Sequence, residues 1–131
     1  MDTLLESGEL EIGVAIGELV HRDFALRPAT LADTYVAAAA VAVPDDLSSD
    51  QAARVAYQMA IDDALVLCQL ASLGRADPVP GVAALVAAID PDDMAILREA
   101  AARLKKKLRQ SRLSFPLIVE PNTCSSELAS A

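Results

Sequence analysis

The chain has 131 residues and is 53% hydrophobic but only 3% aromatic, so Ala, Val and Leu supply most of its apolar surface. With 23% charged residues, this length is typical of one folded domain and argues against a disordered chain. The formal net charge of −8 argues against a dedicated nucleic-acid-binding protein, because such proteins are usually basic.

An N-terminal β-hairpin is predicted over residues 9–26. Apolar residues alternate with Glu and Gly in the first half, which predicts a strand with one buried face. That face carries Leu10, Ile12, Val14 and Ile16. Gly17-Glu18 is typical of a turn, and the second extended run places Val20, Phe24 and Leu26 on one parity.

The hairpin ends at Arg27-Pro28, because a residue that precedes proline favours extended backbone. Thr30 is a predicted N-cap, and Asp33 three residues later nearly completes a capping box. We expect a helix over residues 31–43 that ends before Pro44. Its run of small residues, Ala37–Ala40, would let another helix approach closely.

The longest helix is predicted over residues 50–73. Ser49 is the candidate N-cap, Asp50 complements the helix dipole, and Gly74 is the candidate C-terminal cap. Apolar residues occur on nearly every side of its second half. This pattern is typical of a central, buried helix.

Two more helices are predicted, over residues 81–89 and 91–110. Asp90-Pro91 is a strong start signal for the second one. Its apolar residues recur at spacings of three and four and form a seam for packing, made of Met94, Leu97, Ala101, Leu104 and Leu108. The fold class is therefore α+β, mostly α, with the hairpin packed on three to four helices. We expect one domain over residues 1–110 and an extended C-terminal tail over 111–131.

We expect no catalytic, cofactor or metal site and no small-molecule substrate, so the sequence does not indicate an enzyme. His21 is the only histidine, lies on a strand surface in this interpretation, and has no nucleophile motif around it. Asp62 and Asp63 are adjacent on a helix and point about 100° apart, so they cannot act as a facing pair. Cys68 is expected to be a buried free thiol. Cys124 is too far from Cys68 in the sequence for the two to form a zinc-binding or CxxC pattern.

The cysteine usage favours a reducing, cytoplasmic setting. The longest strongly apolar run, residues 64–73, is too short to cross a bilayer. The sequence therefore gives no indication of a membrane-bound protein.

Positive charge is concentrated near the end of the last predicted helix. Residues 1–97 hold 4 basic and 16 acidic side chains, whereas residues 98–112 hold 7 basic and 1 acidic. The basic patch consists of Arg103, Lys105, Lys106, Lys107 and Arg109. These cations complement the helix dipole, and they could also meet phosphate, lipid headgroups or an acidic patch on a partner or a second copy.

Two segments are candidates for partner binding. On the long helix the candidate residues are Val55, Met59, Val66 and Leu70, and in the tail they are Leu113, Phe115, Leu117 and Val119. An exposed apolar tail strip would be an aggregation risk, so we expect it to be covered. It would pack either on its own core or on a partner by strand addition.

The stretch Phe24-Ala-Leu-Arg27-Pro28-Ala-Thr30-Leu-Ala-Asp33 resembles the entry segment of tail assembly chaperones of Mu-like phages and prophages. In that family a short strand pair leads through an Arg-Pro-Thr type junction into a helix with an early acid. The order of elements is similar over about residues 9–110. The region from Gly81 to Ile89 departs from the family, because it lacks a Thr-Gly-Leu type turn.

The resemblance implies a non-catalytic chaperone that binds the hydrophobic, helical tape-measure protein and keeps it soluble while the phage tail assembles in the bacterial cytoplasm. It also implies self-association, and the sequence itself predicts no membrane partner. A structural virion component, such as a tail-completion or connector protein, is the alternative. A small nucleic-acid-binding regulator that uses the basic patch is a less favoured one.

Overall fold

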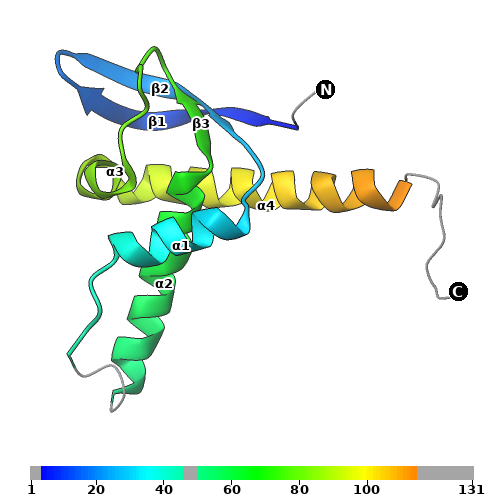
Figure 1. Cartoon of the computed structure of the whole chain (residues 1–131). Helices are drawn as coiled ribbons and strands as arrows, with labels where there is room; N and C mark the ends of the chain where they lie inside the picture. Colours follow the sequence, from blue (N-terminus) through cyan, green and yellow to red (C-terminus); the bar gives the residue numbers. More distant parts are fainter. Residues whose placement is uncertain (1–3, 46–49, 115–131) are drawn as a thin grey trace, which may run out of the picture.

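A computed structural model describes residues 4–45 and 50–114 of the chain. It confirms the α+β class, mostly α, with an N-terminal hairpin packed on helices (Figure 1). The elements in chain order are β1 (Glu6–Ile16), β2 (Leu19–Leu26), α1 (Leu31–Ala40), α2 (Gln51–Cys68), β3 (Leu70–Leu73), α3 (Val82–Ala88) and α4 (Pro91–Ser114). The sheet is antiparallel with strand order β1-β2-β3, so the hairpin gains a third strand that the sequence did not predict.

The alternation predicted for β1 fails in the middle of the strand. Leu10 and Val14 are buried as predicted, but Ile12 is 48% exposed. The register between β1 and β2 shifts between Glu9 and Val14, because β1 bulges there. Ile12 lies inside this irregular stretch and turns toward solvent, and Val14 returns to the buried face where regular pairing resumes.

The bulge is held by Asp93, a fully buried residue in the first turn of α4. Its carboxylate accepts the backbone N–H groups of Glu11, Ile12 and Gly13 at 2.9, 3.1 and 2.8 Å. These N–H groups have no partner in the strand ladder where the register shifts, and the carboxylate supplies one for all three. Gly13 has a φ of +96°, a conformation that side chains disfavour.

The parity of β2 also changes along the strand. Val20, expected on the buried face, is 58% exposed, and His21, expected on the surface, is 8% exposed. His21 Nδ1 accepts the backbone N–H of Arg75 at 3.2 Å, and its ring packs directly against Gly74. Gly74 has a φ of +55° and donates its N–H to the Asp23 carbonyl at 2.6 Å. It therefore ends β3 beside β2, and the prediction that it caps a helix is wrong.

The predicted helix over 50–73 is wrong beyond Cys68. The chain turns at Gln69, and Leu70–Leu73 pairs with β2 as β3. The Arg27 N–H donates to the Gln69 carbonyl at 2.8 Å, and Gln69 Nε2 donates back to the Arg27 carbonyl at 3.0 Å. Leu70 and Leu73 are three residues apart, a spacing that suits a helix, but pairing with the open edge of β2 decides the conformation.

The other helix ends need smaller corrections. Thr30 and Asp33 form the complete capping box of α1. That helix ends at Ala40 instead of residue 43, because Val41 adopts extended backbone. Asp50, rather than Ser49, is the N-cap of α2, and its carboxylate accepts the backbone N–H of Ala52 at 3.0 Å. Ser49 lies outside the described residues. α4 continues to Ser114, so the predicted tail does not begin at Ser111.

The hydrophobic core lies between the sheet and α4. Met94, Leu97 and Leu104 of the predicted seam are buried, but Ala100 replaces Ala101 as the fully buried alanine. The core also includes Leu10, Val14, Phe24, Leu26, Leu67, Leu70, Leu73 and Leu85. The central helix is therefore α4, whereas the sequence predicted the long helix before it.

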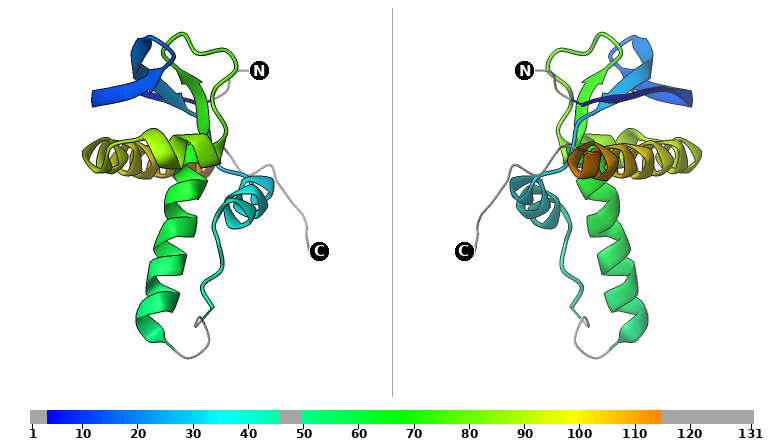
Figure 2. Two further views of the ribbon diagram at one scale, coloured as in Figure 1. Left: turned by 90° about the vertical axis from the view of Figure 1, so that its left-hand side faces the viewer. Right: turned by 90° about the vertical axis from the view of Figure 1, so that its right-hand side faces the viewer.

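We call the sheet, α3 and α4 the body, and we call α1 together with residues 51–61 of α2 the arm. Figure 1 shows α4 running along one side of the sheet, while α2 runs away from both. Both views in Figure 2 show the arm projecting from the body, with α1 beside α2. The fully buried residues of α2, Ala64 and Leu67, lie only in the part that reaches the body.

Candidate partner-binding groove

An apolar groove lies where α1, α2 and α4 meet, and it encloses about 560 Å³. The N-terminal end of α1 and the loop before it form one wall, with Leu31 and Thr34. The second half of α2 forms another wall, with Leu65 and Val66. From α4 come Ala101, Ala102, Leu104, Lys105 and Leu108. The two alanines leave the space, because a larger side chain at either position would extend into the groove.

The apolar surface continues from the groove onto the arm. A smaller hollow of about 210 Å³ shares Asp62 and Val66 with the groove and is also lined by Met59. A third hollow, on the first two turns of α2, shares Met59 and is lined by Val55. Val55, Met59, Asp62 and Val66 follow one another at spacings of four, three and four, so they lie in one line along α2, and three of the four are apolar. We call it the α2 stripe.

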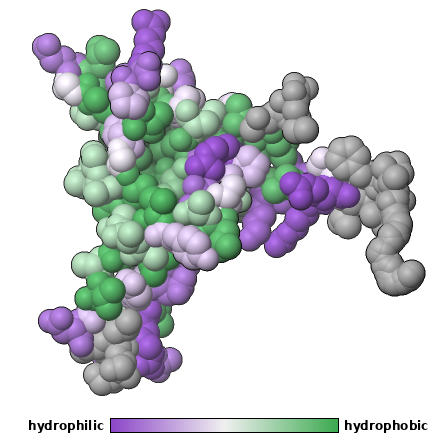
Figure 3. All heavy atoms as spheres, viewed as in Figure 1, coloured by the Kyte–Doolittle hydropathy of each residue, from purple (hydrophilic) through white to green (hydrophobic). Residues whose placement is uncertain are grey.

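Large apolar side chains of the arm remain open to solvent. The exposed fraction is 53% for Val55 and 58% for Met59, and it is 67% for Leu31 and 65% for Tyr35 on α1. Figure 3 shows apolar side chains over the arm and the middle of the molecule, and hydrophilic ones around the C-terminal half of α4. A surface of this kind is typical of a site that binds another apolar surface.

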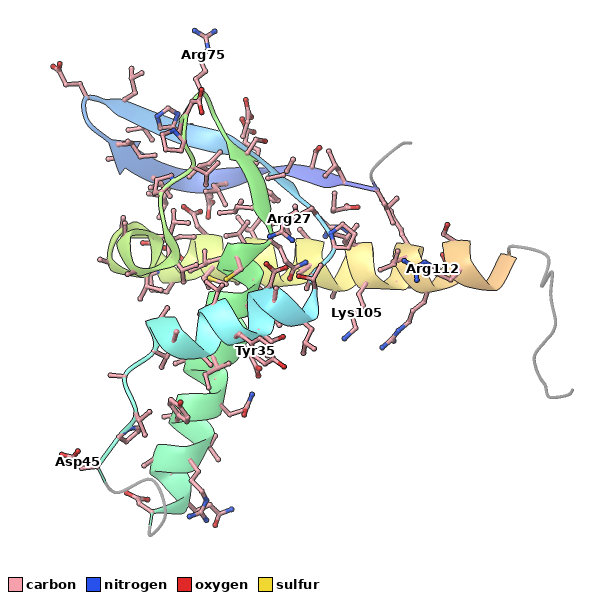
Figure 4. The ribbon with its side chains drawn as sticks, viewed as in Figure 1. Arg27, Tyr35, Asp45, Arg75, Lys105 and Arg112 are labelled. Carbon is pink, nitrogen blue, oxygen red and sulfur yellow. The ribbon has the colours of Figure 1, made fainter. Side chains whose placement is uncertain are left out.

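α1 is held in place at the groove by a partly buried ion pair. Arg27, at the end of β2, donates to both carboxylate oxygens of Asp33 at 2.7 and 2.8 Å and to the Cys68 carbonyl at 3.0 Å. This contact lowers the pKa of Asp33 from 3.8 to about 2. Arg27 thereby joins β2, the start of α1 and the end of α2 (Figure 4), and it fixes the angle between two walls of the groove.

The predicted basic patch divides between two sides of α4. Arg103 Nε and Lys107 Nζ donate to the Glu6 carboxylate at 3.0 and 2.7 Å. Glu6 is almost buried, and its two cationic partners, Lys107 first, lower its pKa. Lys105 instead lines the groove on the side of α4 where α1 lies (Figure 4), and no described residue forms an ion pair with it.

The other predicted partner-binding residues fall in different places. Leu70 is buried in β3 as part of the core, so it is not open to a partner. Leu113 lies in the last turn of α4. The remaining tail residues, Phe115, Leu117 and Val119, lie outside the described residues.

The sequence missed the contribution of α4 to the groove. Ala101 and Leu108 were assigned to the packing seam, and Ala102 was not singled out. The spacing of apolar residues cannot distinguish a buried alanine, such as Ala100, from the neighbouring Ala101 and Ala102, which line the groove. The bulge contact of Asp93 and the ion pair of Arg27 were missed too, although an acid in a first helical turn is a recognisable signal.

The polar residues that could have carried chemistry have structural partners. Asp63 binds Arg98 through two hydrogen bonds of 2.7 and 2.8 Å, while Asp62 accepts from Gln58 at 2.9 Å, so the two acids point to different partners. Cys68 is half-buried, and burial raises the pKa of its thiol. Residues 4–45 and 50–114 contain no cluster of three or more His, Cys, Asp or Glu suited to a metal ion.

No helix in the described part of the chain has the length and apolar character needed to cross a membrane. Comparison with protein-family models finds no match, and neither curated protein sequences nor solved structures give one. The comparisons therefore add nothing to the resemblance to tail assembly chaperones, which rests on the sequence at the join of β2 and α1 alone.

Proposed function

We propose that the protein is a non-catalytic phage tail assembly chaperone that holds an apolar helical segment of the tape-measure protein in the groove. The observation that carries this proposal is the open apolar groove between α1, α2 and α4, extended by the α2 stripe. Proteins that recognise helices commonly offer a hydrophobic groove of this kind, which receives apolar side chains spaced three and four residues apart.

The physical properties of the rest of the chain suit this role. A protein that binds an aggregation-prone helix needs surface charge to keep the complex in solution, and this chain carries a formal net charge of −8. The small side chains of Ala101 and Ala102 let a helix backbone come close to α4. Within the join where the resemblance lies, the ion pair of Arg27 with Asp33 sets the position of α1, and Pro28, Ala29 and Thr30 line the groove.

The test is co-expression with the long helical tape-measure protein that this proposal expects a neighbouring gene to encode. We expect a soluble complex that copurifies in a fixed ratio. Ala102→Gln, which places an uncharged amide on the groove floor, should weaken the complex by about tenfold, roughly the effect of leaving a buried polar group unpaired. The matched control is Ala95→Gln, at an exposed position on the same helix outside the groove.

Two results would overturn the proposal. One is a complex that Ala102→Gln and Ala95→Gln affect equally, because the groove would then have no part in binding. The other is the presence of this chain in purified mature particles, which would favour the structural virion component.

A further inference from the structure

The groove has an uneven charge distribution along α4. Of the cations that the sequence grouped as one patch, Arg103 and Lys107 both pair with the single carboxylate of Glu6 on the side facing the sheet. Lys105 lies on the groove side and forms no ion pair with any described residue. Arg109, four residues further on, follows Lys105 on the same face, and Arg112 continues that face into the last turn.

The opposite direction along the groove is not basic. Toward the arm, the groove is lined by Asp62, and the nearby Arg98 is neutralised by Asp63. An occupant of the groove would therefore meet positive charge beside the C-terminal half of α4 and a carboxylate beside α2. Figure 1 shows that α4 extends past the other elements at this basic end, so an occupant could follow it beyond the groove.

We propose that the groove selects partner helices that carry acidic side chains at the end lying along α4, with Lys105 as the main specificity-determining residue and Arg109 and Arg112 continuing the same face. This inference rests on the proposed function, because it specifies which apolar helix the groove accepts. The reason is charge complementarity, which fixes the direction and register of a bound partner more than it raises affinity. It also explains why only part of the basic patch is neutralised within the fold.

The experiment uses two synthetic helical peptides of about 20 residues with the same Leu/Ala stripe, one ending in three Glu and the other in three Lys. Binding to the full chain is measured by fluorescence anisotropy at low and at high salt. We expect the Glu peptide to bind about three- to tenfold tighter at low salt, with the difference shrinking at high salt. Lys105→Glu should remove this preference.

The matched control is Lys106→Glu, which makes the same charge change at the adjacent exposed lysine outside the groove lining and should keep most of the preference. Circular dichroism of both variants checks that they fold. Equal binding of the two peptides, or a preference that Lys105→Glu leaves unchanged, would overturn the charge selection. In both cases the groove could still bind apolar helices, provided that Ala102→Gln weakens both peptides.

Failure of the proposed function has a different result, since neither peptide would then bind, or Ala102→Gln would have no effect on either. Duplex DNA and anionic lipid vesicles are titrated in parallel. If they bind more tightly than the Glu peptide and lose binding in Lys105→Glu, the basic face serves a phosphate-bearing partner, and this inference is wrong.

Discussion

The body and the arm use their apolar residues in opposite ways. In the body, large side chains from the sheet, α3 and α4 form a continuous core, and its polar groups are paired, as Asp93 and Glu6 are. In the arm, α1 buries only Asp33 and Ala37, while Leu31, Tyr35, Val55 and Met59 stay exposed. The comparison indicates that most of the buried contacts lie in the body and that the arm, with the groove at its base, leaves an apolar surface exposed, which is the surface our proposal assigns to a partner.

The largest effect on this division should come from Asp93→Ala in the body. Three backbone N–H groups of the β1 bulge would lose a buried, charged acceptor, so we expect the free energy of unfolding to fall by about 3 kcal/mol or more. Urea unfolding followed by circular dichroism measures it. The control is Asp92→Ala, an exposed acid of the same turn, which should cost less than about 1 kcal/mol. Equal losses in the two variants would show that the bulge does not depend on the carboxylate.

The junction between body and arm should give an intermediate effect. Asp33→Asn keeps an oxygen for the capping box but removes the charge that pairs with Arg27. Because the pKa of Asp33 is lowered from 3.8 to about 2, with Arg27 as the largest cause and Thr30 as a further one, these contacts together should stabilise the folded protein by at most about 2 kcal/mol at neutral pH. Urea unfolding at neutral pH should show this loss in Asp33→Asn.

The pH dependence of that loss identifies its source. A carboxyl whose pKa is lowered by folding stabilises above its unfolded pKa, and this stabilisation disappears as the pH falls toward the folded value. The difference between the unfolding free energies of the wild type and Asp33→Asn should therefore be constant above about pH 5 and shrink below about pH 4. Glu6, whose pKa is also lowered, titrates in both proteins and cancels in the difference. A difference that stays constant down to low pH would exclude the ion pair as its cause.

The same contrast explains what could be predicted from the sequence. The hairpin, the capping box and the seam of α4 depend on neighbours a few residues apart, so alternation, caps and spacing revealed them. β3 and the bulge depend on distant partners: Gln69 joins Arg27 42 residues away, and Asp93 joins residues of β1 80 to 82 positions away. A local pattern cannot show such contacts, and Leu70–Leu73 suits a helix as well as a strand.

The groove was predictable to the extent that one helix forms it. Val55, Met59 and Val66 were predicted as partner-binding candidates on the long helix, and the structure places them on the α2 stripe. The contribution of α4 could not be identified, because it depends on the angle at which α4 crosses α2. Glu6 pairs with Arg103 and Lys107 rather than with Lys105, so which lysine has no ion pair with a described residue depends, in turn, on the position of Glu6 in the sheet.

The smallest effect on stability should come from Met59→Ser on the arm, and comparing it with Met94→Ser in the body tests the division most sharply. Met59, on the arm, is 58% exposed, whereas Met94, in the body, is 5% exposed. Met94→Ser should lower the free energy of unfolding by about 2 kcal/mol or more, and Met59→Ser should change it by less than about 0.5 kcal/mol. Met59→Ser should nevertheless weaken the binding of the Glu peptide severalfold, because it replaces an apolar side chain of the α2 stripe by a hydroxyl.

If Met59→Ser destabilises the fold as much as Met94→Ser does, the arm belongs to the folding core. If it changes neither stability nor binding, the α2 stripe lies outside the contact surface, and the occupant of the groove contacts only the part lined by α1 and α4.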